Sequence, residues 1–456
     1  MIVESIAYHP RKLQAKPKKG FFIEYRLDLY PRLEEAEFSV FNANNILCCK
    51  DDALNADLLD KMLSSDALID LDTKQLDKYS DKVDTSRLIL STHLPAFDET
   101  AIRSFLSHPQ PAKVYKLVYE AATLQEMIDT AQIIAEQQDR DVIFNVTGKW
   151  AYFQRSFFHF FNSIGLYSAL EEPLFEGQPT SIYLSRMVDA VYAEDSMVLL
   201  VLGSDKVSQS GSVRFGNSVL AKLDLHTAFI PVPARDVSEA MAACKFTAQR
   251  ARLLGMAITS PFKHIMADFF RTGKDAINTI QFNSQKHLKN YYCPELDAFV
   301  YPANTDLICL QEAMQGLNIH KKHSILIYGS GDCATAFTKK LLQSGYKDIQ
   351  IEGRNKQTVE NLRQSFGIED NPKAEYDLLI NASGLGQDKN DDLSVLPSFK
   401  ALVNLPLPQP VSLLEDYAQE HEIPLFSSTA FWSHQFSHQI KCFLYQNSTN
   451  PVDTFE

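Results

Sequence analysis

The chain has 456 residues, of which 45% are hydrophobic and 22% charged, so it is long enough for two or three domains of ordinary globular composition. Its net charge of −13 argues against a surface for nucleic acid or anionic membrane, and its 7 scattered cysteines, with no CxxC pair, indicate neither a disulfide framework nor a zinc ribbon. No long apolar run and no secretory signal are evident, so we expect a cytoplasmic protein that does not span a membrane.

The first half of the chain, from Gly20 onward, alternates short apolar segments with stretches of helical periodicity. Strict alternation of strand and helix implies parallel strands, and its repetition over about 190 residues favours a (β/α)₈ TIM barrel over an open sheet. The expected strands are 21–29, 44–49, 66–72, 86–93, 113–119 and 141–148, and the expected helices are 54–65, 98–108 and 122–138.

Polar residues interrupt these apolar strands. Glu24, Arg26 and Asp28 occupy alternate positions of one strand and therefore face the same way. Lys116 lies in the middle of the apolar segment VYKLVY, and taken alone it is most simply an exposed lysine on a half-buried strand. Inside a barrel, however, desolvation would lower its pKa and free the amine as a nucleophile. Asp70, Asp72 and His93 add polar groups to two further strands.

A family resemblance rests on these same segments. In order and approximate spacing, IEYRLDL, LIDLD, ILSTH and VYKLVYEAAT resemble type I 3-dehydroquinate dehydratase, a (β/α)₈-barrel family. The resemblance implies that Lys116 forms an imine with the ketone of 3-dehydroquinate and that His93 is the general acid/base. A protonated imine stabilises the carbanion-like state as the α-proton leaves and water is expelled. The resemblance assigns substrate binding to Glu24, Arg26, Lys50, Arg155 and Gln178.

Departures from that family's pattern concern substrate binding. Lys50 stands where an arginine is usual, and it supplies charge without a planar two-pronged grip. Leu174 stands where a serine is usual. A barrel that has lost its chemistry and persists as a scaffold is therefore an alternative, although the presence of both Lys116 and His93 favours an active dehydratase.

The second half carries the pattern of a dinucleotide site. The segment SILIYGSGDCATAF, residues 324–337, is an apolar strand, a glycine turn and the start of a helix, so a pyrophosphate could lie at the helix N-terminus. Arg354 and Lys356 end the next strand and suit the 2′-phosphate of NADP, whereas Glu352 keeps NAD possible. The predicted cofactor-binding residues are Gly329, Ser330, Gly331, Asp332, Cys333, Ala334, Arg354, Lys356, Asn381 and Ser383.

A second resemblance includes the motifs before that turn. VSQSGSVRFGN, AITSPFK, AINT and NTD, followed by the glycine turn, resemble shikimate dehydrogenase in order over most of residues 197–450. The resemblance implies that Lys263 and Asp306 are the catalytic pair, in which the ammonium stabilises the developing alkoxide and Asp306 positions it. It assigns shikimate binding to Ser210, Ser212, Thr259, Asn278 and Gln435.

Other side chains in this half have simpler interpretations. Taken singly, Lys263 or Asp306 would be a surface charge, and only their place among ordered motifs makes them functional. Ala257 and Gly353 replace asparagines of the family pattern. His434 and His438 have the i,i+4 spacing of metal ligands but no evident third ligand, so we expect a helix face and no metal.

Together the two resemblances cover nearly the whole chain, and their reactions are consecutive. We expect a dehydratase barrel at residues 1–194, a substrate-binding domain at 195–315 completed by a C-terminal helix at about 425–456, and a Rossmann NADP-binding domain at 316–424. Such an enzyme of aromatic amino acid biosynthesis dehydrates 3-dehydroquinate to 3-dehydroshikimate and reduces that product to shikimate with NADPH. The alternatives are a shikimate or quinate dehydrogenase with a decayed barrel, and a non-catalytic ligand-binding regulator. The expected partners are these small molecules.

Overall fold

The computed structural model describes residues 1–7, 21–29, 38–50, 53–79, 82–170, 172–174, 178–223, 225–274, 276–283, 291–407 and 411–444. The chain forms two compact units, the first being Met1–Val198 with Asp205–Ser208 and Asn217–Arg252, and the second Leu199–Ser204, Gln209–Gly216 and Leu253–Glu456. The domain limits expected from the sequence stay a prediction, and residues 445–456 of the expected C-terminal helix lie outside the described residues. Within the described ranges, no helix is both long and apolar enough to cross a membrane.

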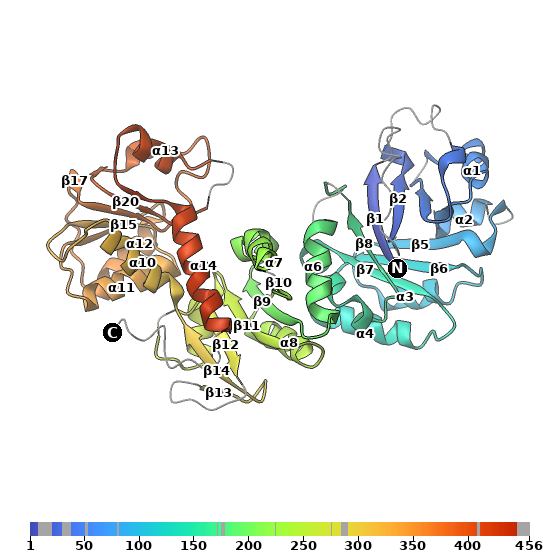
Figure 1. The fold of residues 1–456 in the computed structure, drawn as a ribbon, viewed down its shortest axis with the longest axis horizontal. Coiled ribbons are helices and arrows are strands. Elements are labelled where there is room, and N and C mark those ends of the chain that lie inside the picture. The colour runs from blue at the N-terminus through green and yellow to red at the C-terminus, as the bar shows by residue number, and fades with distance from the viewer. Residues whose placement is uncertain are drawn as a thin grey trace. The chain divides into compact units, whose positions relative to one another are not determined.

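The first unit contains a nearly closed sheet of 8 parallel strands, in the order β7-β6-β5-β4-β3-β2-β1-β8. Figure 1 labels β1, β2, β5, β6, β7 and β8 of this sheet. The strands β7 and β8 end this order, and the Tyr167 backbone N–H donates to Asn145 Oδ1 at 3.0 Å, so a side chain bridges the two ends. The strands are β1 (Ile2–Ala7), β2 (Phe21–Arg26), β3 (Asn45–Cys48), β4 (Leu68–Asp72), β5 (Leu88–Leu94), β6 (Val114–Glu120), β7 (Val142–Thr147) and β8 (Leu166–Ala169).

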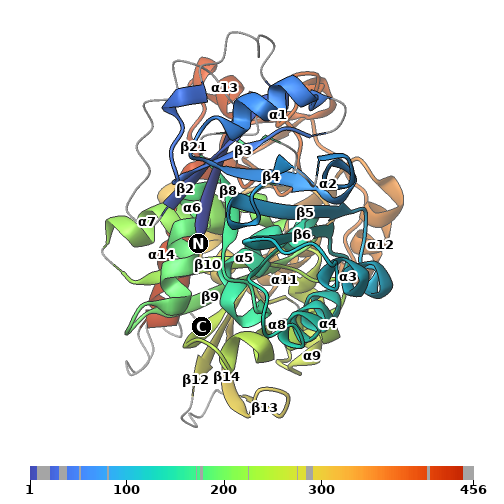
Figure 2. The ribbon, with the colours of Figure 1, turned by 90° about the vertical axis from the view of Figure 1, so that its right-hand side faces the viewer.

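Helices follow the strands from β3 onward, and Figure 2 shows β4, β5 and β6 side by side. The local sequence explains where the helices begin: the side chains of Asn55, Asp98 and Thr123 each accept a backbone N–H of the first helical turn. The helices are α1 (Ala56–Leu63), α2 (Thr73–Tyr79), α3 (Glu99–Leu106), α4 (Leu124–Ala135), α5 (Ala151–Ser156) and α6 (Ser181–Tyr192). Short 3₁₀ turns are η2 (Leu27–Leu29), η4 (Phe38–Val40), η7 (Thr85–Arg87), η8 (Gly148–Trp150) and η9 (Phe158–Phe161).

A layer of inward-facing side chains fills one end of this sheet. Its members come from seven different strands and are buried together, so they close the sheet at that end. Val114 belongs to the layer, and Lys116, two residues further along β6, must face the same way because side chains alternate along a strand. The layer is Val3, Ile46, Leu68, Ile89, Val114, Ile143 and Tyr167.

The rest of the first unit packs on α5 and η9 through aromatic rings. Phe246 contacts Phe153, Phe157 and Phe161, with ring centroids 5.9, 5.6 and 5.0 Å away. Aromatic pairs at these separations stabilise a core beyond the area they bury. The elements concerned are α7 (Asn217–Lys222), β10 (Thr227–Pro233) and α8 (Val237–Ala248).

A sheet of 6 strands has the order β10-β9-β11-β12-β14-β13, in which β11, β12, β14 and β13 pair antiparallel. Its further strands are β9 (Met197–Gly203), β11 (Leu253–Ile258), β12 (Thr279–Asn283), β13 (Tyr291–Cys293) and β14 (Ala298–Ala303). The adjoining helices are η10 (Val207–Gln209), the π-helix η11 (Ser212–Gly216), α9 (Phe262–Phe269) and α10 (Thr305–Gly316).

The second unit also holds a Rossmann-like sheet of 5 parallel strands, in the order β16-β15-β18-β20-β21. Since the strand order reverses beside β15, ligands are expected at its carboxyl end. The strands are β15 (Ile325–Tyr328), β16 (Ile349–Glu352), β18 (Leu378–Asn381), β20 (Leu402–Asn404) and β21 (Leu425–Phe426), with a small pair β17 (Glu375–Tyr376) and β19 (Ser398–Phe399). The helices are α11 (Asp332–Gln343), α12 (Lys356–Phe366), η12 (Leu393–Val395), α13 (Leu413–Glu420) and α14 (Ser428–Leu444).

Candidate active sites

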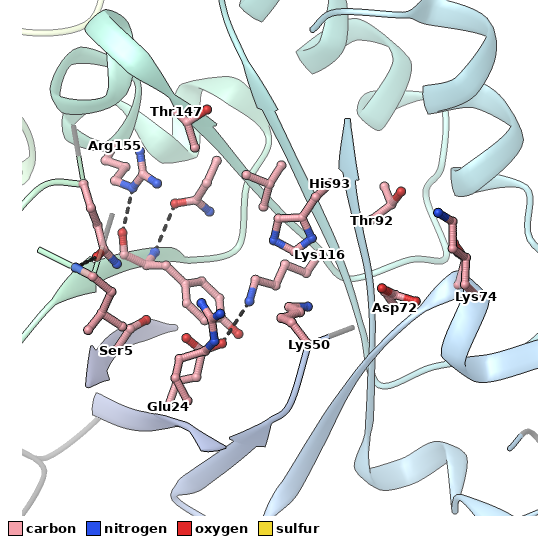
Figure 3. Close-up of a pocket in the computed structure, with 17 residues that line it drawn as sticks. Ser5, Glu24, Lys50, Asp72, Lys74, Thr92, His93, Lys116, Thr147 and Arg155 are labelled. Atoms are coloured by element: carbon pink, nitrogen blue, oxygen red, sulfur yellow. Dashed lines mark hydrogen bonds and ion pairs between the residues drawn. The ribbon is translucent and has the colours of Figure 1, made fainter. Parts of the chain in front are cut away.

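A cavity of about 480 Å³ lies among the strands of the nearly closed sheet (Figure 3). All the residues that the sequence predicts as the dehydratase site line this cavity, together with Ser5, Asp72, Lys74, Asn145, Tyr167 and Leu174, among others. The predicted residues are Glu24, Arg26, Lys50, His93, Lys116, Arg155 and Gln178. The structure therefore brings them together from separate strands, while their chemical roles stay predictions.

Lys116 is buried in this cavity with only 5% of its surface exposed. Its ammonium nitrogen Nζ lies 2.9 Å from Glu24 Oε1 and 2.7 Å from Asp70 Oδ2, and 3.9 Å above the ring of Tyr167. The expectation of a lowered pKa is wrong: burial lowers the pKa of Lys116, but the charges of Asp70 and Glu24 outweigh it and raise the pKa well above its usual value. The lysine is therefore an ammonium at rest and must lose a proton before it can attack a carbonyl.

Asp70 stands out in the sequence as a polar residue of a predicted strand, but the sequence reasoning assigns it no role in the site. It is fully buried beneath the cavity and accepts hydrogen bonds from Lys116, from Ser91 Oγ at 2.6 Å and from Lys50 Nζ at 3.3 Å. Despite its burial, the charges of Lys116 and Lys50 hold the pKa of Asp70 far below its usual range. Its place in the strand LIDLD, one alternation before Asp72, is the signal that could have found it.

His93 lies at the end of β5, where its side chain is exposed while lining the cavity. Its pKa is lowered to about 3, first by desolvation and then by the charges of Lys50 and Lys116. The imidazole is neutral at pH 7 and free to accept a proton.

This electrostatic arrangement predicts the titration of His93. We expect its ring to stay neutral in NMR titrations well below pH 6, since neighbouring ammonium groups disfavour a second cation. Replacing Lys50 by methionine removes one of these positive charges, so the pKa of His93 should rise in Lys50→Met. An unchanged titration in that variant, or a wild-type midpoint near the ordinary value of about 6.5, would contradict the arrangement.

Arg155 is a buried cation without a carboxylate partner among the described residues. It is 2% exposed, and its Nε and Nη1 donate to the carbonyls of Tyr167 at 2.6 Å and Val146 at 2.5 Å. Desolvation lowers the pKa of Arg155 to about 9, because no nearby anion offsets its burial. A buried, fixed and uncompensated guanidinium favours an anionic ligand.

Arg26 and Gln178 are engaged within the protein instead. Arg26 forms a two-pronged pair with Asp28, at 2.9 and 2.6 Å, and Gln178 Oε1 accepts the Leu174 N–H at 2.7 Å. Either side chain would have to give up a partner to bind substrate directly. Arg155 is thus the guanidinium better prepared to receive a carboxylate.

One group of side chains at and beneath this cavity has the composition of a metal site. Ligand atoms of Glu24, Cys48 and Asp70 all lie within 4.8 Å of one another. The ammonium of Lys116, however, already binds both carboxylates, and burial raises the pKa of the Cys48 thiol. The ammonium of Lys116 therefore occupies the position between the two carboxylates that a metal ion would need. The expectation of no metal stays a prediction.

The second cluster of reactive side chains lies in the second unit. Lys263, at the start of α9, places Nζ 2.6 Å from Oδ2 of Asp306, in the first turn of α10, and 3.2 Å from Cys333 Sγ at the start of α11. Burial lowers the pKa of Lys263, but Asp306 outweighs it and the pKa is raised. The structure thus forms the predicted lysine–aspartate pair and adds a thiol to it.

A network of amides and hydroxyls adjoins Asp306. Asn278 Oδ1 accepts the backbone N–H of Thr305 at 2.9 Å, and its Nδ2 donates to Thr305 Oγ1 at 2.9 Å. Gln435 Nε2 also donates to Thr305 Oγ1, at 2.8 Å. The predicted substrate residues Asn278 and Gln435 therefore meet at Thr305, which precedes Asp306 in the chain.

The two predicted serines flank a glycine that packs against α14. A Cβ on Gly211 would lie 2.5 Å from Trp432 Nε1, so the close approach requires glycine. Ser212 is buried, and Ser210 Oγ is buried without a hydrogen-bond partner among the described residues, an orphan that a ligand hydroxyl could satisfy. Thr259 Oγ1 donates to the Leu202 carbonyl at 3.2 Å, and no interaction within the described ranges ties these three residues to Lys263.

The glycine turn after β15 has the shape of a phosphate cradle. Gly329 has φ +143°, and a Cβ there would lie 2.6 Å from the Ala382 carbonyl oxygen. Gly331 caps α11, and a Cβ added to it would meet no atom within 4 Å, so the helix N-terminus has open space, and Ala334 is fully buried behind it. Asp332 in the first turn opposes an anion, but the cradle otherwise fits a dinucleotide pyrophosphate.

The steric limit at Gly329 can be tested directly. We expect Gly329→Ala to lower the free energy of unfolding by about 1–3 kcal/mol, since the new methyl group must displace the Ala382 backbone at a φ that alanine disfavours. Urea denaturation measures this loss. Gly331→Ala is the matched control, because its added methyl meets open space, and an equal loss in both variants would contradict the proposed cradle geometry.

The basic side chains near the end of β16 differ in whether they form ion pairs within the protein. Lys356 pairs with Glu352 at 3.0 Å, and Arg363 pairs with the same carboxylate at 2.6 Å. Arg354 forms no ion pair among the described residues and lines a surface hollow that Lys389 and two aspartates, Asp388 and Asp391, also border. Arg354 is thus the more available partner for a cofactor phosphate.

Asn381 and Ser383 shape the loop after β18. Asn381 Nδ2 donates to the Leu385 carbonyl at 3.0 Å, and its Oδ1 accepts Ser383 Oγ at 2.8 Å. They hold the loop by these bonds, while a direct role with the cofactor stays a prediction, as it does for Ser330.

His434 and His438 both hydrogen-bond Glu312, at 2.9 and 2.8 Å, along one face of α14.

The fold and these clusters define an α/β protein with two sets of buried, reactive side chains, as enzymes have. No family model matches the chain. It is 25% identical over 270 residues to a Prochlorococcus marinus (strain MIT 9215) protein named shikimate dehydrogenase (NADP(+)), covering 58% of this chain and 82% of that one. A protein of the same name from strain MIT 9312 is 26% identical over 227 residues, covering 45% of this chain and 73% of its own length.

Solved structures give weaker similarities. The shikimate 5-dehydrogenase of Thermus thermophilus, in complex with NADP(H) and shikimate, has 20% identity and a TM-score of 0.42, covering 54% of this chain and 93% of its own. The S. pombe AroM structure named "Dehydroquinate dehydratase and shikimate dehydrogenase" has 13% identity and a TM-score of 0.41, covering 97% of this chain and 95% of its own. Both scores are low, so the sequence similarity to shikimate dehydrogenases is the finding that bears on function.

Proposed function

We propose that the chain is a bifunctional enzyme that dehydrates 3-dehydroquinate to 3-dehydroshikimate and then reduces this product to shikimate with NADPH. The observation that carries the dehydrogenase half is the 2.6 Å contact between Lys263 and Asp306 in the unit that holds the glycine turn. The similarity to Prochlorococcus shikimate dehydrogenases supports the same assignment.

In the dehydrogenase half, NADPH supplies the hydride when bound. The glycine turn at Gly329 and Gly331 would hold the pyrophosphate of NADPH. Arg354 would hold the 2′-phosphate of NADPH. The Lys263 ammonium hydrogen-bonds the substrate carbonyl, stabilises the oxygen as negative charge develops, and delivers a proton to it. Asp306 holds the ammonium in place, while the unpartnered hydroxyl of Ser210 is suited to a ring hydroxyl or carboxylate.

In the barrel half, the buried strand lysine carries the proposal. Lys116 forms an imine with the substrate ketone, which makes the adjacent C–H more acidic. His93, neutral by its environment, removes the α-proton and donates it to the hydroxyl on the next carbon, which leaves as water. Water then hydrolyses the product imine, which releases the ketone and regenerates the amine of Lys116. Arg155 anchors the substrate carboxylate, because it is the buried guanidinium that has no carboxylate partner among the described residues.

The proposal is tested by trapping the imine. Protein incubated with 3-dehydroquinate and borohydride should carry a reduced adduct on the peptide containing Lys116, located by mass spectrometry. Shikimate-dependent reduction of NADP, compared with quinate and with NAD, tests the second half. A folded protein that gives neither adduct nor NADPH would contradict the proposal and favour a ligand-binding regulator.

A second candidate is a shikimate dehydrogenase whose barrel has no chemistry. The observation in its favour is that Lys116 is held by two buried carboxylates, as in a structural ion pair. In that case the second half reduces NADP while 3-dehydroquinate gives no adduct and no enone product.

A further inference from the structure

The lysine of the nearly closed sheet is protonated at rest, so the proposed dehydration needs a group that takes its proton. Two carboxylates contact Lys116 Nζ, Asp70 at 2.7 Å and Glu24 at 2.9 Å. Resting on the proposed dehydratase function, we propose that Glu24 is the proton acceptor that converts Lys116 into a nucleophile and returns the proton to the departing oxygen. Glu24 then has a catalytic role beyond the substrate binding assigned to it from the sequence.

The two carboxylates differ in what else they bind. Asp70 is fully buried, does not line the cavity, and accepts further hydrogen bonds from Ser91 and Lys50. A proton placed on Asp70 would compete with these donors and leave Lys50 without its counter-ion. Asp70 therefore stays charged and anchors the lysines.

Glu24 has the opposite environment. It lines the cavity where the ketone must enter, and its only hydrogen bond and ion pair among the described residues are with Lys116 (Figure 3). Proton transfer to Glu24 breaks no other hydrogen bond, and the protonated acid stays beside the substrate oxygen. The side chain thus satisfies the geometric requirement for a general acid/base, which is hydrogen-bond reach of the proton it moves.

The step balances with Glu24 regenerated. Glu24 takes a proton from the Lys116 ammonium. The amine lone pair then attacks the ketone carbon while the C=O π electrons move to the oxygen, and protonated Glu24 donates its proton to that oxygen. Glu24 then removes a second proton from nitrogen and gives it to the carbinol oxygen, which leaves as water as the C=N bond forms. One ammonium and one ketone yield one protonated imine and one water. His93 remains available for the α-proton.

The charges around Lys116 determine how a substitution of Glu24 should change the pKa of this lysine. Removing one carboxylate from around an ammonium lowers its pKa, so Glu24→Gln should contain more free amine at pH 7 than the wild type. If Glu24 were only a counter-ion, this variant would form the imine faster. If Glu24 transfers protons, it forms the imine more slowly despite the extra free amine. Among the described residues, the other titratable groups near Lys116 are Cys48, Lys50, Asp70, His93 and Tyr167.

The experiment measures these two quantities separately. Reductive methylation of Lys116 with formaldehyde and cyanoborohydride, followed by mass spectrometry across pH, gives the midpoint of the free amine without the substrate. Borohydride trapping with 3-dehydroquinate gives the rate of imine formation. We expect Glu24→Gln to lower the methylation midpoint and to slow trapping about 100-fold, with partial recovery in Glu24→Asp.

Glu120→Gln is the matched control, because this glutamate is exposed at the end of β6, the strand of Lys116, and does not contact its amine. Thermal unfolding verifies that each variant is folded. Trapping in Glu24→Gln that is as fast as in the wild type, or faster, overturns the proposal. If the wild type gives no adduct with 3-dehydroquinate, the proposed dehydratase function is wrong. The role of Glu24 is then decided by the rate of methylation per free amine: a lower rate in Glu24→Gln supports Glu24 as proton acceptor, and an unchanged rate overturns it.

Discussion

Replacing Lys116 by alanine should abolish the dehydration of 3-dehydroquinate, lowering its rate by about 1,000-fold or more, while shikimate oxidation continues at the wild-type rate. The imine has no other means of formation once the amine is gone, and neither Glu24 nor Asp70 can supply a nucleophilic nitrogen. Formation of the enone product, followed by its absorbance, measures the first activity, and shikimate-dependent NADPH formation measures the second.

The stability of this variant needs its own control. Lys116→Ala leaves two buried carboxylates without their shared cation, so the free energy of unfolding should be lower than in the wild type. Lys116→Met fills more of the vacated volume, and the double variant Lys116→Met with Glu24→Gln also removes one unpaired charge. Dehydration that persists in folded Lys116→Ala, at more than a few per cent of the wild-type rate, would contradict the imine mechanism.

Replacing Lys263 by alanine should have the reverse effect: shikimate oxidation falls by about 100- to 1,000-fold and dehydration is unchanged. In the proposed mechanism this ammonium, held by Asp306, donates to the substrate oxygen, and loss of one such donor has an effect of this size on developing oxyanions. The loss should appear mainly in kcat rather than in the KM for NADP, because Lys263 acts on the substrate oxygen.

Arginine at this position is a matched comparison that keeps the charge. Lys263→Arg retains the attraction to Asp306 but replaces a compact ammonium by a planar group that does not deprotonate, so we expect only a small recovery of rate. Steady-state kinetics with both substrates measures these effects. Loss of both activities in Lys263→Ala or in Lys116→Ala would contradict two independent sites.

Much of the fold follows from local pattern. The six segments expected as strands, from 21–29 to 141–148, each overlap one strand in the structure, because apolar runs of that length bounded by polar residues are typical of buried strands. Two strands of the eight-stranded sheet escaped the pattern. The segment Ile2–Ala7 was considered only as a possible targeting signal, and Leu166–Ala169 is too short to show a period.

The site shows where local pattern stops being informative. Lys116 stood out because its neighbours are apolar, but its partners Glu24 and Asp70 come from β2 and β4, and only the register of the sheet places them at its amine. The error in the direction of the lysine's pKa has the same origin: the sequence indicates burial but not the countercharges. Cys333, which contacts Lys263 from another element, was likewise predicted only as part of a glycine turn.

The central claim is that one chain catalyses two consecutive reactions, and one measurement tests it most directly. Purified protein is given 3-dehydroquinate and NADPH with no other enzyme, and shikimate and NADP are quantified over time. The account predicts that shikimate appears in equal amount to the NADPH consumed, after a lag in which 3-dehydroshikimate accumulates. If the protein reduces added 3-dehydroshikimate but leaves 3-dehydroquinate unchanged, the unit with the nearly closed sheet is not a dehydratase and the account of the first half is wrong.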